Sequence, residues 1–247
     1  MYSYNELAYY YDILMDDVDY GLWSDYIVEL YNYYGVKPQK ILDTACGTGN
    51  ITIPMAKKGY TMWGVDLSTD MLSIAQNKAD KQKQKIRFLN QDMSQLRIND
   101  KFDSVLCMCD GVNYIIEEKA LISFFKNAYE RLTDGGLFVF DISSRYKLST
   151  ILGNNSLYQE KNNINYIWNN NYDEKKSLVE MYLVFFVPEN EEMYRRFEEE
   201  HVQRAYDAEY LADLLLRQGF GDISVFDEFS FEKPGEKSER IFFAARK

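Results

Sequence analysis

The sequence predicts an α/β fold: a mostly parallel sheet of seven strands with helices on both faces. Short apolar runs alternate with amphipathic stretches over residues 40–142, which is typical of strand–helix–strand units. The runs at 102–109 and 137–142 are almost unbroken, as expected for parallel strands buried on both sides. Two further runs, 223–229 and 240–245, are joined by a short loop, so these two strands must be antiparallel.

The first strand, 40–43, leads into a turn that contains two glycines. Residues 41–51 read Ile-Leu-Asp-Thr-Ala-Cys-Gly-Thr-Gly-Asn-Ile, and a helix is predicted over 50–58. Glycines let the backbone pass close to a ligand, and the helix N-terminus offers unpaired N–H groups to an anionic group. The next strand, 61–66, ends in Asp66, where a carboxylate can hold ribose hydroxyls. These features together predict a nucleotide-like ligand.

Charge discriminates between two such ligands. The dinucleotide fingerprint needs a third glycine where this chain has Thr52. Asp43, directly before the turn, would repel a pyrophosphate but would attract an α-amino group or a sulfonium. S-adenosylmethionine (SAM) carries both of these cations together with a ribose and an adenine. SAM is therefore favoured over NAD, and an NAD-dependent oxidoreductase is the alternative.

The string Asp43–Gly49 resembles the first motif of class I SAM-dependent methyltransferases, which commonly reads D-x-A-C-G-T-G. The resemblance covers about residues 4–142 and 206–246 and looks like the small-molecule subgroup. It implies a Rossmann-like fold with SAM as the cofactor, in which Asp66 accepts both ribose hydroxyls. The residues that the resemblance places against SAM are Asp43, Ala45, Cys46, Gly47, Gly49, Asp66, Leu67, Met71, Asp92, Met93 and Cys109.

Residues 1–35 are predicted to form one or two tyrosine-rich amphipathic helices. The segment from Tyr4 to Asp12 resembles the Y/F-x-x-L-A-x-x-Y-D segment with which many small-molecule methyltransferases cap the SAM pocket. This resemblance implies that Tyr11, Tyr20 and Trp23 reach the methionine end of SAM or the acceptor. The alternative is that these rings only pack a helix against the sheet.

The end of the fourth strand is where the transferred methyl group is expected to point. In open α/β sheets the ligand lies outside the carboxyl ends of the strands. The string Asp110–Tyr114 resembles the D-S-x-N-Y segment of a methyltransferase subgroup, although Gly111 replaces the serine. It differs from the N/D-P-P-Y string that holds a flipped base. Asn113 and Tyr114 are therefore candidate contacts to the acceptor.

Residues 143–205 interrupt the strand–helix alternation. A short helix is predicted over 146–152, and three antiparallel strands over about 163–171, 177–187 and 192–204. Such a meander can cover the site as a lid. The predicted division is a SAM-binding domain over 1–142 and 206–247, with 1–35 as its helical cap, and a lid or acceptor-binding insertion over 143–205.

The last predicted strand of the insertion carries the only histidine of the chain, His201. Strand alternation places His201 and Gln203 on one face and Val202 and Arg204 on the other. Because this strand returns to the main domain, His201 and Arg204 are candidate contacts to the acceptor. The alternative for His201 is a packed or surface histidine without a chemical role.

Composition excludes several classes of function. The formal net charge of −11 argues against a nucleic-acid substrate, which needs a basic surface. The sequence has no apolar run long enough for a membrane span and no signal peptide at its start, which predicts a cytoplasmic protein. Three cysteines without C-x-x-C spacing, beside one histidine, predict neither a disulfide framework nor a zinc site.

The sequence therefore predicts methyl transfer from SAM to a nitrogen or oxygen of a small molecule, by in-line displacement. Positioning and exclusion of water are expected to do most of the work. A base can remove the proton of a hydroxyl acceptor, and Asp110, His201 and Tyr11 are the candidates for it. The alternatives are an RNA- or protein-modifying methyltransferase and a non-catalytic SAM-binding module, and either a monomer or a homodimer is expected.

Overall fold

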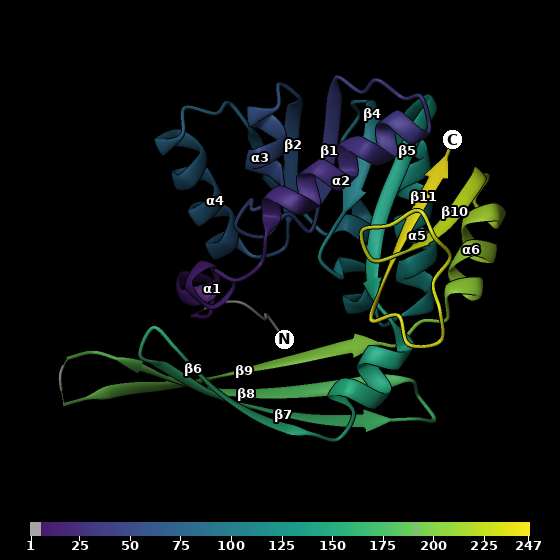
Figure 1. The fold of residues 1–247 in the computed structure, drawn as a ribbon. Helices are drawn as coiled ribbons and strands as arrows, with labels where there is room; N and C mark the ends of the chain where they lie inside the picture. Colours follow the sequence, from purple (N-terminus) through teal and green to yellow (C-terminus); the bar gives the residue numbers. More distant parts are fainter. Residues whose placement is uncertain (1–5, 191) are drawn as a thin grey trace.

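The computed structural model describes residues 6–190 and 192–247, so Tyr4 of the N-terminal segment lies outside the described part (Figure 1). The seven-stranded sheet is confirmed, in the order β10-β11-β5-β4-β1-β2-β3. Its strand β11 is antiparallel to both neighbours, β5 and β10, and the other paired strands are parallel. The strands are β1 (Lys40–Thr44), β2 (Thr61–Asp66), β3 (Arg87–Asn90), β4 (Phe102–Cys107), β5 (Leu132–Ser143), β10 (Gly221–Asp227) and β11 (Arg240–Arg246).

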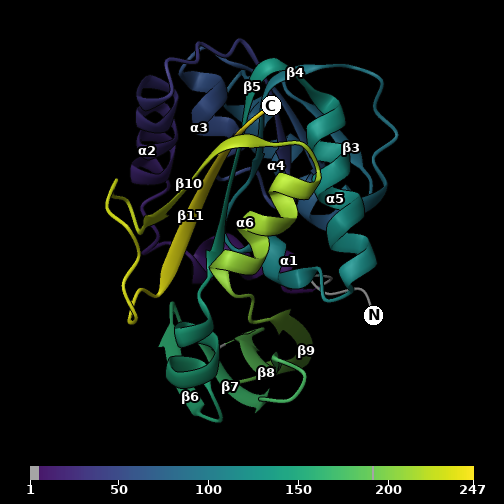
Figure 2. The same cartoon turned by 90° about the vertical axis from the view of Figure 1, so that its right-hand side faces the viewer.

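Helices cover both faces of this sheet. Figure 2 shows α2 (Tyr20–Tyr33) and α3 (Thr52–Lys57) on one face, with α5 (Glu118–Arg131) and α6 (Ala208–Arg217) on the other. The alternation along β1 explains the two layers, because Ile41 packs with the α2 side and Leu42 with the α5 side. A fifth helix, α4 (Thr69–Lys81), lies near β2 and β3. Among the described helices, none is both long and apolar enough to cross a bilayer.

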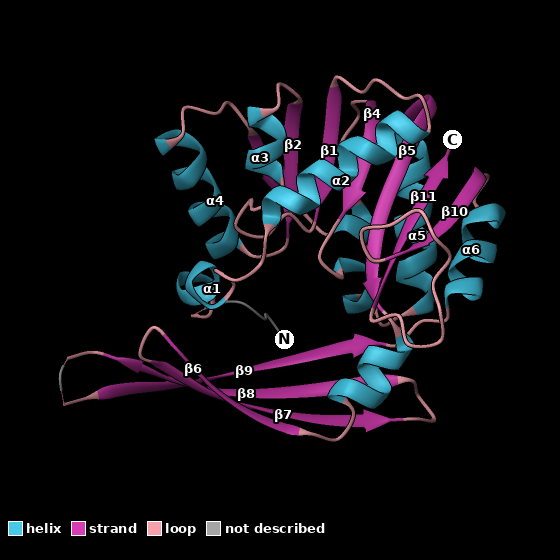
Figure 3. Cartoon of the chain, in the orientation of Figure 1, coloured by secondary structure: helices cyan, strands magenta, loops and turns pink. Residues whose placement is uncertain are grey.

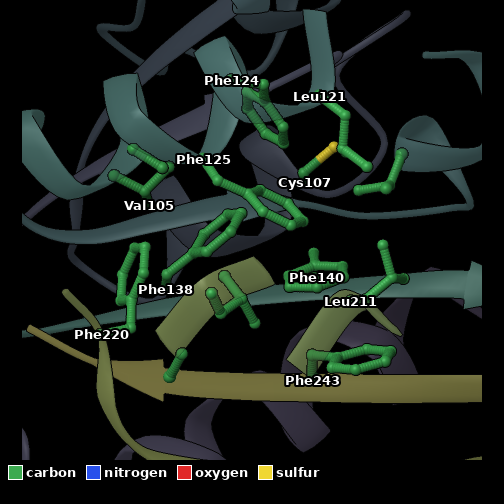
Figure 4. Close-up of a cluster of buried hydrophobic side chains, with 14 of the residues drawn as sticks. Val105, Cys107, Leu121, Phe124, Phe125, Phe138, Phe140, Leu211, Phe220 and Phe243 are labelled. Carbon is green, nitrogen blue, oxygen red and sulfur yellow. The ribbon is translucent and has the colours of Figure 1, made fainter. Parts of the chain in front are cut away.

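Stacked phenylalanine rings make up much of the core on the α5 side (Figure 4). Phe138 and Phe140 of β5 lie between the rings of α5 and those of the C-terminal hairpin. The Phe140 and Phe243 rings are stacked with centroids 4.5 Å apart, and Phe124 meets Phe138 edge-on at 5.7 Å. Such pairs contribute about 1 kcal/mol each beyond the area they bury. This core fixes β5 and β11, which carry Asp141 and Arg240 beside the end of β4.

The insertion forms a second, four-stranded antiparallel sheet in the order β6-β7-β8-β9. Its strands are β6 (Ser156–Lys161), β7 (Ile164–Asp173), β8 (Leu178–Pro188) and β9 (Tyr194–Arg204), preceded by the short helix η3 (Lys147–Leu152). The prediction of three strands missed β6. This strand is almost wholly exposed and polar, so it lacks the apolar alternation that marked the others. The positive φ angles of Asn162 (51°) and Asn163 (64°) close its tight hairpin with β7.

The second sheet lies beyond the carboxyl ends of the parallel strands, with helix α1 (Ala8–Leu14) between the two sheets (Figures 1 and 3). The second sheet has its own hydrophobic cluster, which includes Leu7, Leu148, Val179, Phe185 and Phe197. The N-terminal helix therefore packs with the insertion, although they are far apart in sequence.

A buried asparagine connects the two sheets. Asn113, fully buried at the end of β4, donates from Nδ2 to the carbonyl oxygens of Ser143 and Arg204, at 3.0 and 2.9 Å. Its Oδ1 accepts from the Ser143 backbone N–H at 3.0 Å. These bonds hold the ends of β5 and β9 together. The Asn113 side chain, which was predicted to contact the acceptor, is thus bonded to the backbone of both β5 and β9.

Replacing Asn113 by alanine is expected to destabilise the fold by about 3 kcal/mol, because it leaves buried backbone groups unsatisfied. Urea unfolding of Asn113→Ala and of the exposed control Asn99→Ala measures the difference. A loss below about 1 kcal/mol, the net value of an ordinary hydrogen bond, would show that the connection is not needed.

Candidate active site

The turn after β1 has the open geometry that a bound ligand needs. Ala45, Gly47 and Gly49 all have positive φ, at 57°, 53° and 80°. A Cβ built on Gly47 would have no heavy atom within 4 Å, whereas one on Gly49 would lie 3.2 Å from Ile53. The backbone at Gly47 is therefore open to close approach, and Gly49 allows the turn to pack against α3. A non-glycine residue such as Ala45 in this conformation is strained, as is common at functional sites.

Asp66, at the end of β2, holds this turn from the side. Its Oδ2 accepts the Gly47 N–H at 2.8 Å, and its Oδ1 accepts the Ser68 N–H at 2.8 Å. Burial raises the pKa of Asp66, while the backbone N–H groups lower it. Leu67 follows as an exposed residue and Met71 is buried in α4, whose start is capped by the Ser68 side chain.

Asp43 is buried beneath the turn. Its Oδ2 accepts the Thr52 hydroxyl at 2.5 Å, so Thr52, which breaks the dinucleotide fingerprint, supports the acidic residue instead. Burial raises the pKa of Asp43 to about 7, although the Thr52 bond lowers it, and the nearby Asp66 raises it further. Within the turn Cys46 is buried, and burial raises the pKa of its thiol well above its usual value.

The loop after β3 is ordered by Asp92. Its Oδ1 accepts the Ser94 N–H at 2.7 Å and so begins the short helix η1 (Met93–Gln95). The thioether of Met93 lies 3.9 Å from the Cys107 thiol at the end of β4. Asp92 and Met93, which the resemblance places against SAM, therefore lie next to the ends of β3 and β4.

At the end of β4, Cys109 and Asp110 also have positive φ, at 58° and 53°. They precede the short helix η2 (Gly111–Tyr114). A Cβ on Gly111 would lie 2.8 Å from the Cys107 Sγ and 3.1 Å from the Ala45 Cβ. The departure from serine at this position therefore has a steric cause: the ends of β1 and β4 approach each other here.

The Asp110 carboxylate is held by partners from distant parts of the chain. Its Oδ1 lies 3.1 Å from the Arg240 guanidinium, and its Oδ2 accepts from Gln203 Nε2 at 2.7 Å. Its backbone N–H donates to Asp141 at 3.0 Å, and Asp141 is also paired with Arg240. Burial raises the pKa of Asp141 to about 6, although Arg240 lowers it. Sequence reasoning did not identify Gln203, Asp141 or Arg240 as parts of the site.

Trp23 contributes to the site through Arg240. The guanidinium lies 5.0 Å from the centre of the Trp23 ring, and this ring packs against Phe229 and Phe242 at 5.2 and 5.4 Å. Trp23 is only 5% exposed. These contacts favour a packing role for Trp23 behind the Asp110–Arg240 pair. Packing was the alternative to the predicted contact of Trp23 with SAM or the acceptor.

Tyrosines from separate elements gather near Asp110. Burial first, then the nearby Tyr20, Cys109, Asp110 and Tyr114, raise the pKa of Tyr11 well above its usual value. Burial likewise raises the pKa of Tyr20 to about 12. At neutral pH both side chains are therefore phenols that can donate a hydrogen bond. The structure thus places Tyr11 and Tyr20 near Cys109 at the end of β4, and their contact with SAM or the acceptor stays a prediction.

His201 faces this cluster from β9. Its ring meets Tyr114 edge-on with centroids 5.9 Å apart, and burial lowers its pKa to about 4. The predicted alternation is confirmed, since His201 and Gln203 are buried while Val202 and Arg204 are partly exposed. Arg204 turns away, donating to the carbonyl oxygens of Ile116 and Lys176 at 2.8 and 3.0 Å. Its geometry favours a structural role over contact with an acceptor.

Other places in the described chain offer less. Two shallow hollows of about 430 and 260 Å³ lie around β3, away from the ends of β1 and β4. They contain none of the strained residues or buried carboxyls of the site, so we do not place the chemistry there. Within residues 6–190 and 192–247, no group of three or more His, Cys, Asp or Glu side chains is arranged to hold a metal ion.

The fold and site define an α/β protein whose glycine turn, buried Asp43 and strand-end Asp66 fit a ligand that combines a ribose with a cationic amino acid. Comparisons with known proteins agree. A family model described as "Methyltransferase domain" matches residues 41–136. A "Putative methyltransferase" of Geobacillus sp. (strain WCH70) is 37% identical over 99% of this chain and 100% of its own length. "Putative methyltransferase YqeM" of Bacillus subtilis (strain 168) is 36% identical over 99% of this chain and 97% of its own.

Solved structures extend the likeness over the whole fold. A SAM-dependent methyltransferase from Clostridium acetobutylicum ATCC 824 is 40% identical, covers 98% of both chains and has a TM-score of 0.89. The methyltransferase CcbJ from Streptomyces caelestis shares the fold at 15% identity, with a TM-score of 0.81 over 98% of this chain and 99% of its own. The chain belongs to the class I SAM-dependent methyltransferase family, and SAM is its methyl donor.

Asp66→Ala is expected to weaken SAM binding by roughly tenfold to a hundredfold, since a hydrogen bond to a charged group is worth about 1.5–3 kcal/mol. Isothermal titration with SAM, beside the exposed control Asp80→Asn, measures the effect. An affinity within about twofold of the wild type would refute the assignment of Asp66 to the ribose.

The buried Asp43 predicts a pH-dependent stability. Its pKa is about 7 in the folded chain against an ordinary 3.8, so the native state binds more protons between these values. The contribution of Asp43 to the free energy of unfolding is fully present below 3.8, its pKa in the unfolded chain. It is lost as the pH rises through about 7, its pKa in the folded chain. The free energy of unfolding of wild type minus that of Asp43→Asn should fall by about 1 kcal/mol per pH unit between about pH 5 and 7. Urea titrations at each pH test this, and a constant difference would contradict it.

Proposed function

We propose that this enzyme transfers the methyl group of SAM to a nitrogen or oxygen of a small-molecule acceptor held between the two sheets. One observation carries the proposal: at the end of β4 the Tyr114 ring of η2 meets the His201 ring of β9 edge-on, and the buried Tyr11 of α1 is near enough to Tyr114 for its pKa to be raised by it. Such a site suits a small acceptor more than a polymer. The net charge of −11 also disfavours a phosphate backbone.

The donor would be held by the turn after β1. In this proposal Ala45, Cys46, Gly47 and Gly49 line its amino-acid part above Asp43. Asp66 accepts the ribose hydroxyls. The adenine is flanked by residues that follow β2, namely Leu67 and Met71, and by residues that follow β3, namely Asp92 and Met93. Tyr11, Tyr20 and Cys109 complete the methionine end. When bound, SAM supplies a methyl carbon that is already activated by its sulfonium.

The protonation states of the candidate bases favour nitrogen over oxygen. Tyr11 remains a phenol at neutral pH because its pKa is raised, and His201 is a neutral imidazole whose low pKa makes it a weak base. Asp110 is engaged by Arg240 and Gln203. These groups are better suited to orient an acceptor than to deprotonate it. A neutral amine already presents its lone pair, so it needs no strong base.

The insertion, residues 143–205, is proposed as the acceptor-binding unit, and residues 1–142 with 206–247 as the donor-binding domain. The inner face of β9 supplies His201 and Gln203, while Tyr114 and Asp110 come from the main domain. Closure of these surfaces would exclude water from the reacting atoms. The proposed partner is the acceptor itself, with the chain acting as a monomer or a homodimer.

The proposal is tested by measuring S-adenosylhomocysteine (SAH) formation from SAM with panels of small amines and phenols. We expect turnover with a subset of the amines and slower turnover with phenols. Turnover only with tRNA or protein would overturn the small-molecule assignment. SAM binding without turnover on any panel would favour a non-catalytic module.

The variant His201→Gln is expected to lower kcat/KM for the acceptor by about tenfold, because a positioning contact is lost, while the Kd of SAM stays within about twofold. The histidine carries charge only below its pKa of about 4, so its effect should not change between pH 6 and 9. Steady-state kinetics over this range, with the exposed Tyr33→Phe as control, give the comparison. If kcat/KM of the wild type instead falls below about pH 6.5 and that of the variant does not, His201 titrates as a base.

A further inference from the structure

Helix α1 is built into the unit that covers the site. Leu7, Tyr10 and Leu14 pack on the hydrophobic cluster of the second sheet, with Tyr10 stacked on Phe197 at 5.8 Å. The segment that follows the helix is fixed to the same sheet, since Lys161 Nζ lies 2.6 Å from both Asp16 and Asp17. In sequence α1 belongs to the donor-binding domain, but its packing joins it to the second sheet, so we treat α1 and the second sheet as one packed unit, here called the cover.

Asp12 points from this cover to the donor-binding half. Its Oδ1 accepts from the Thr48 hydroxyl at 2.7 Å and from Asn50 Nδ2 at 2.9 Å. Its Oδ2 lies 2.6 Å from Lys78 Nζ of α4, and Lys78 in turn donates to the Asn50 side-chain oxygen. One carboxylate of the cover thus holds two residues of the glycine turn and one of the neighbouring helix.

The position of Thr48 gives this contact its significance. Thr48 is 1% exposed and stands between Gly47 and Gly49, both at positive φ. Glycines adopt many conformations, and within the turn the Gly49 N–H donates to the Cys46 carbonyl oxygen at 2.9 Å, so the turn depends on further bonds from outside to keep its shape. Asp66 holds the turn by the Gly47 N–H from one strand, and Asp12 holds it by the Thr48 side chain from the cover. The two carboxylates together define one conformation of the turn.

The environment keeps Asp12 ionised. Burial raises its pKa, but the bonds from Lys78, Thr48 and Asn50 outweigh this effect, so the pKa lies below its ordinary value. The side chains of Lys78 and Asp12 are 24% and 36% exposed, and solvent weakens an ion pair of this kind. The strength of the contact therefore comes from three donors that converge on one carboxylate.

We propose that Asp12 is a positioning residue for the methyl donor: through Thr48 and Asn50 it holds the glycine turn in its binding conformation while the cover is closed. Release of the donor or of its product then requires that the Asp12 contacts open, so that cofactor exchange and opening of the cover are coupled. This inference concerns the donor side and does not depend on which acceptor is methylated.

The test is the dissociation rate of SAH from the full-length protein, measured by surface plasmon resonance. Asp12→Ala is expected to release SAH about tenfold faster, which corresponds to about 1.4 kcal/mol. The matched control is Asp17→Ala, which also removes a carboxylate 2.6 Å from a lysine, but one that joins α1 only to the second sheet. Its SAH dissociation rate should stay within about twofold of the wild type. Equal acceleration by both variants, or an unchanged rate in Asp12→Ala, would overturn the proposal.

Two further variants separate positioning from general destabilisation. Asp12→Asn keeps an oxygen for Thr48 and Asn50 but turns an N–H group toward Lys78, so its SAH dissociation rate should fall between those of the wild type and Asp12→Ala. A rate equal to that of Asp12→Ala would show that the bonds to Thr48 and Asn50 do not hold the donor. Lys78→Met removes the cationic partner and should also accelerate release; if Asp12→Ala does not fold, this variant carries the test and an unchanged rate refutes the proposal. In the double variant, Asp12→Ala should add less than it does alone, because both changes break the same contact. Full additivity would count against a shared network.

Discussion

The site depends on carboxylates that capture the backbone N–H groups of strained turns. Asp66 at the end of β2 accepts the N–H of Gly47 in the turn after β1, and Asp141 of β5 accepts the N–H of Asp110 in the turn after β4. Both donor residues have φ of 53°. In each case the carboxylate comes from the adjacent strand of the sheet, so the pairing of strands itself brings the hydrogen-bond acceptor to the turn. A parallel sheet thereby fixes two turns that glycine and left-handed residues would otherwise leave mobile.

This arrangement also determines the chemistry of the space between the sheets. Near the end of β4 the carboxyl groups of Asp110 and Asp141 are engaged by Arg240, so the nearby groups that carry no charge at neutral pH are the Tyr11 phenol and the His201 imidazole. Such groups orient a substrate through directed hydrogen bonds and aromatic faces, and they add little charge to a reaction in which the donor is already cationic. Geometry therefore contributes more to this site than acid–base strength.

Most of the fold could be predicted from the sequence because it is recorded in local patterns. Apolar runs predicted the parallel strands, which the structure contains, and the two glycines predicted the turn after β1, whose role in binding the donor stays a prediction. Strand β6 could not be predicted, because an exposed polar edge strand has no apolar periodicity and only the Asn162–Asn163 turn marks it. The partners of Asp110 were equally inaccessible, since Gln203 and Arg240 lie far along the chain and only tertiary packing brings them near. The same holds for Asn113 and Arg204, whose side chains bind backbone groups.

The stacking of Arg240 on Trp23 has an optical consequence. Trp23 is one of three tryptophans in the chain, and its indole lies 5.0 Å from the guanidinium that pairs with Asp110. A cation so close to an indole face perturbs its excited state, and the surrounding phenylalanines keep water away. A rearrangement of Asp110 that moves Arg240 would therefore change the surroundings of a natural fluorophore. The protein carries its own spectroscopic reporter of events at the end of β4.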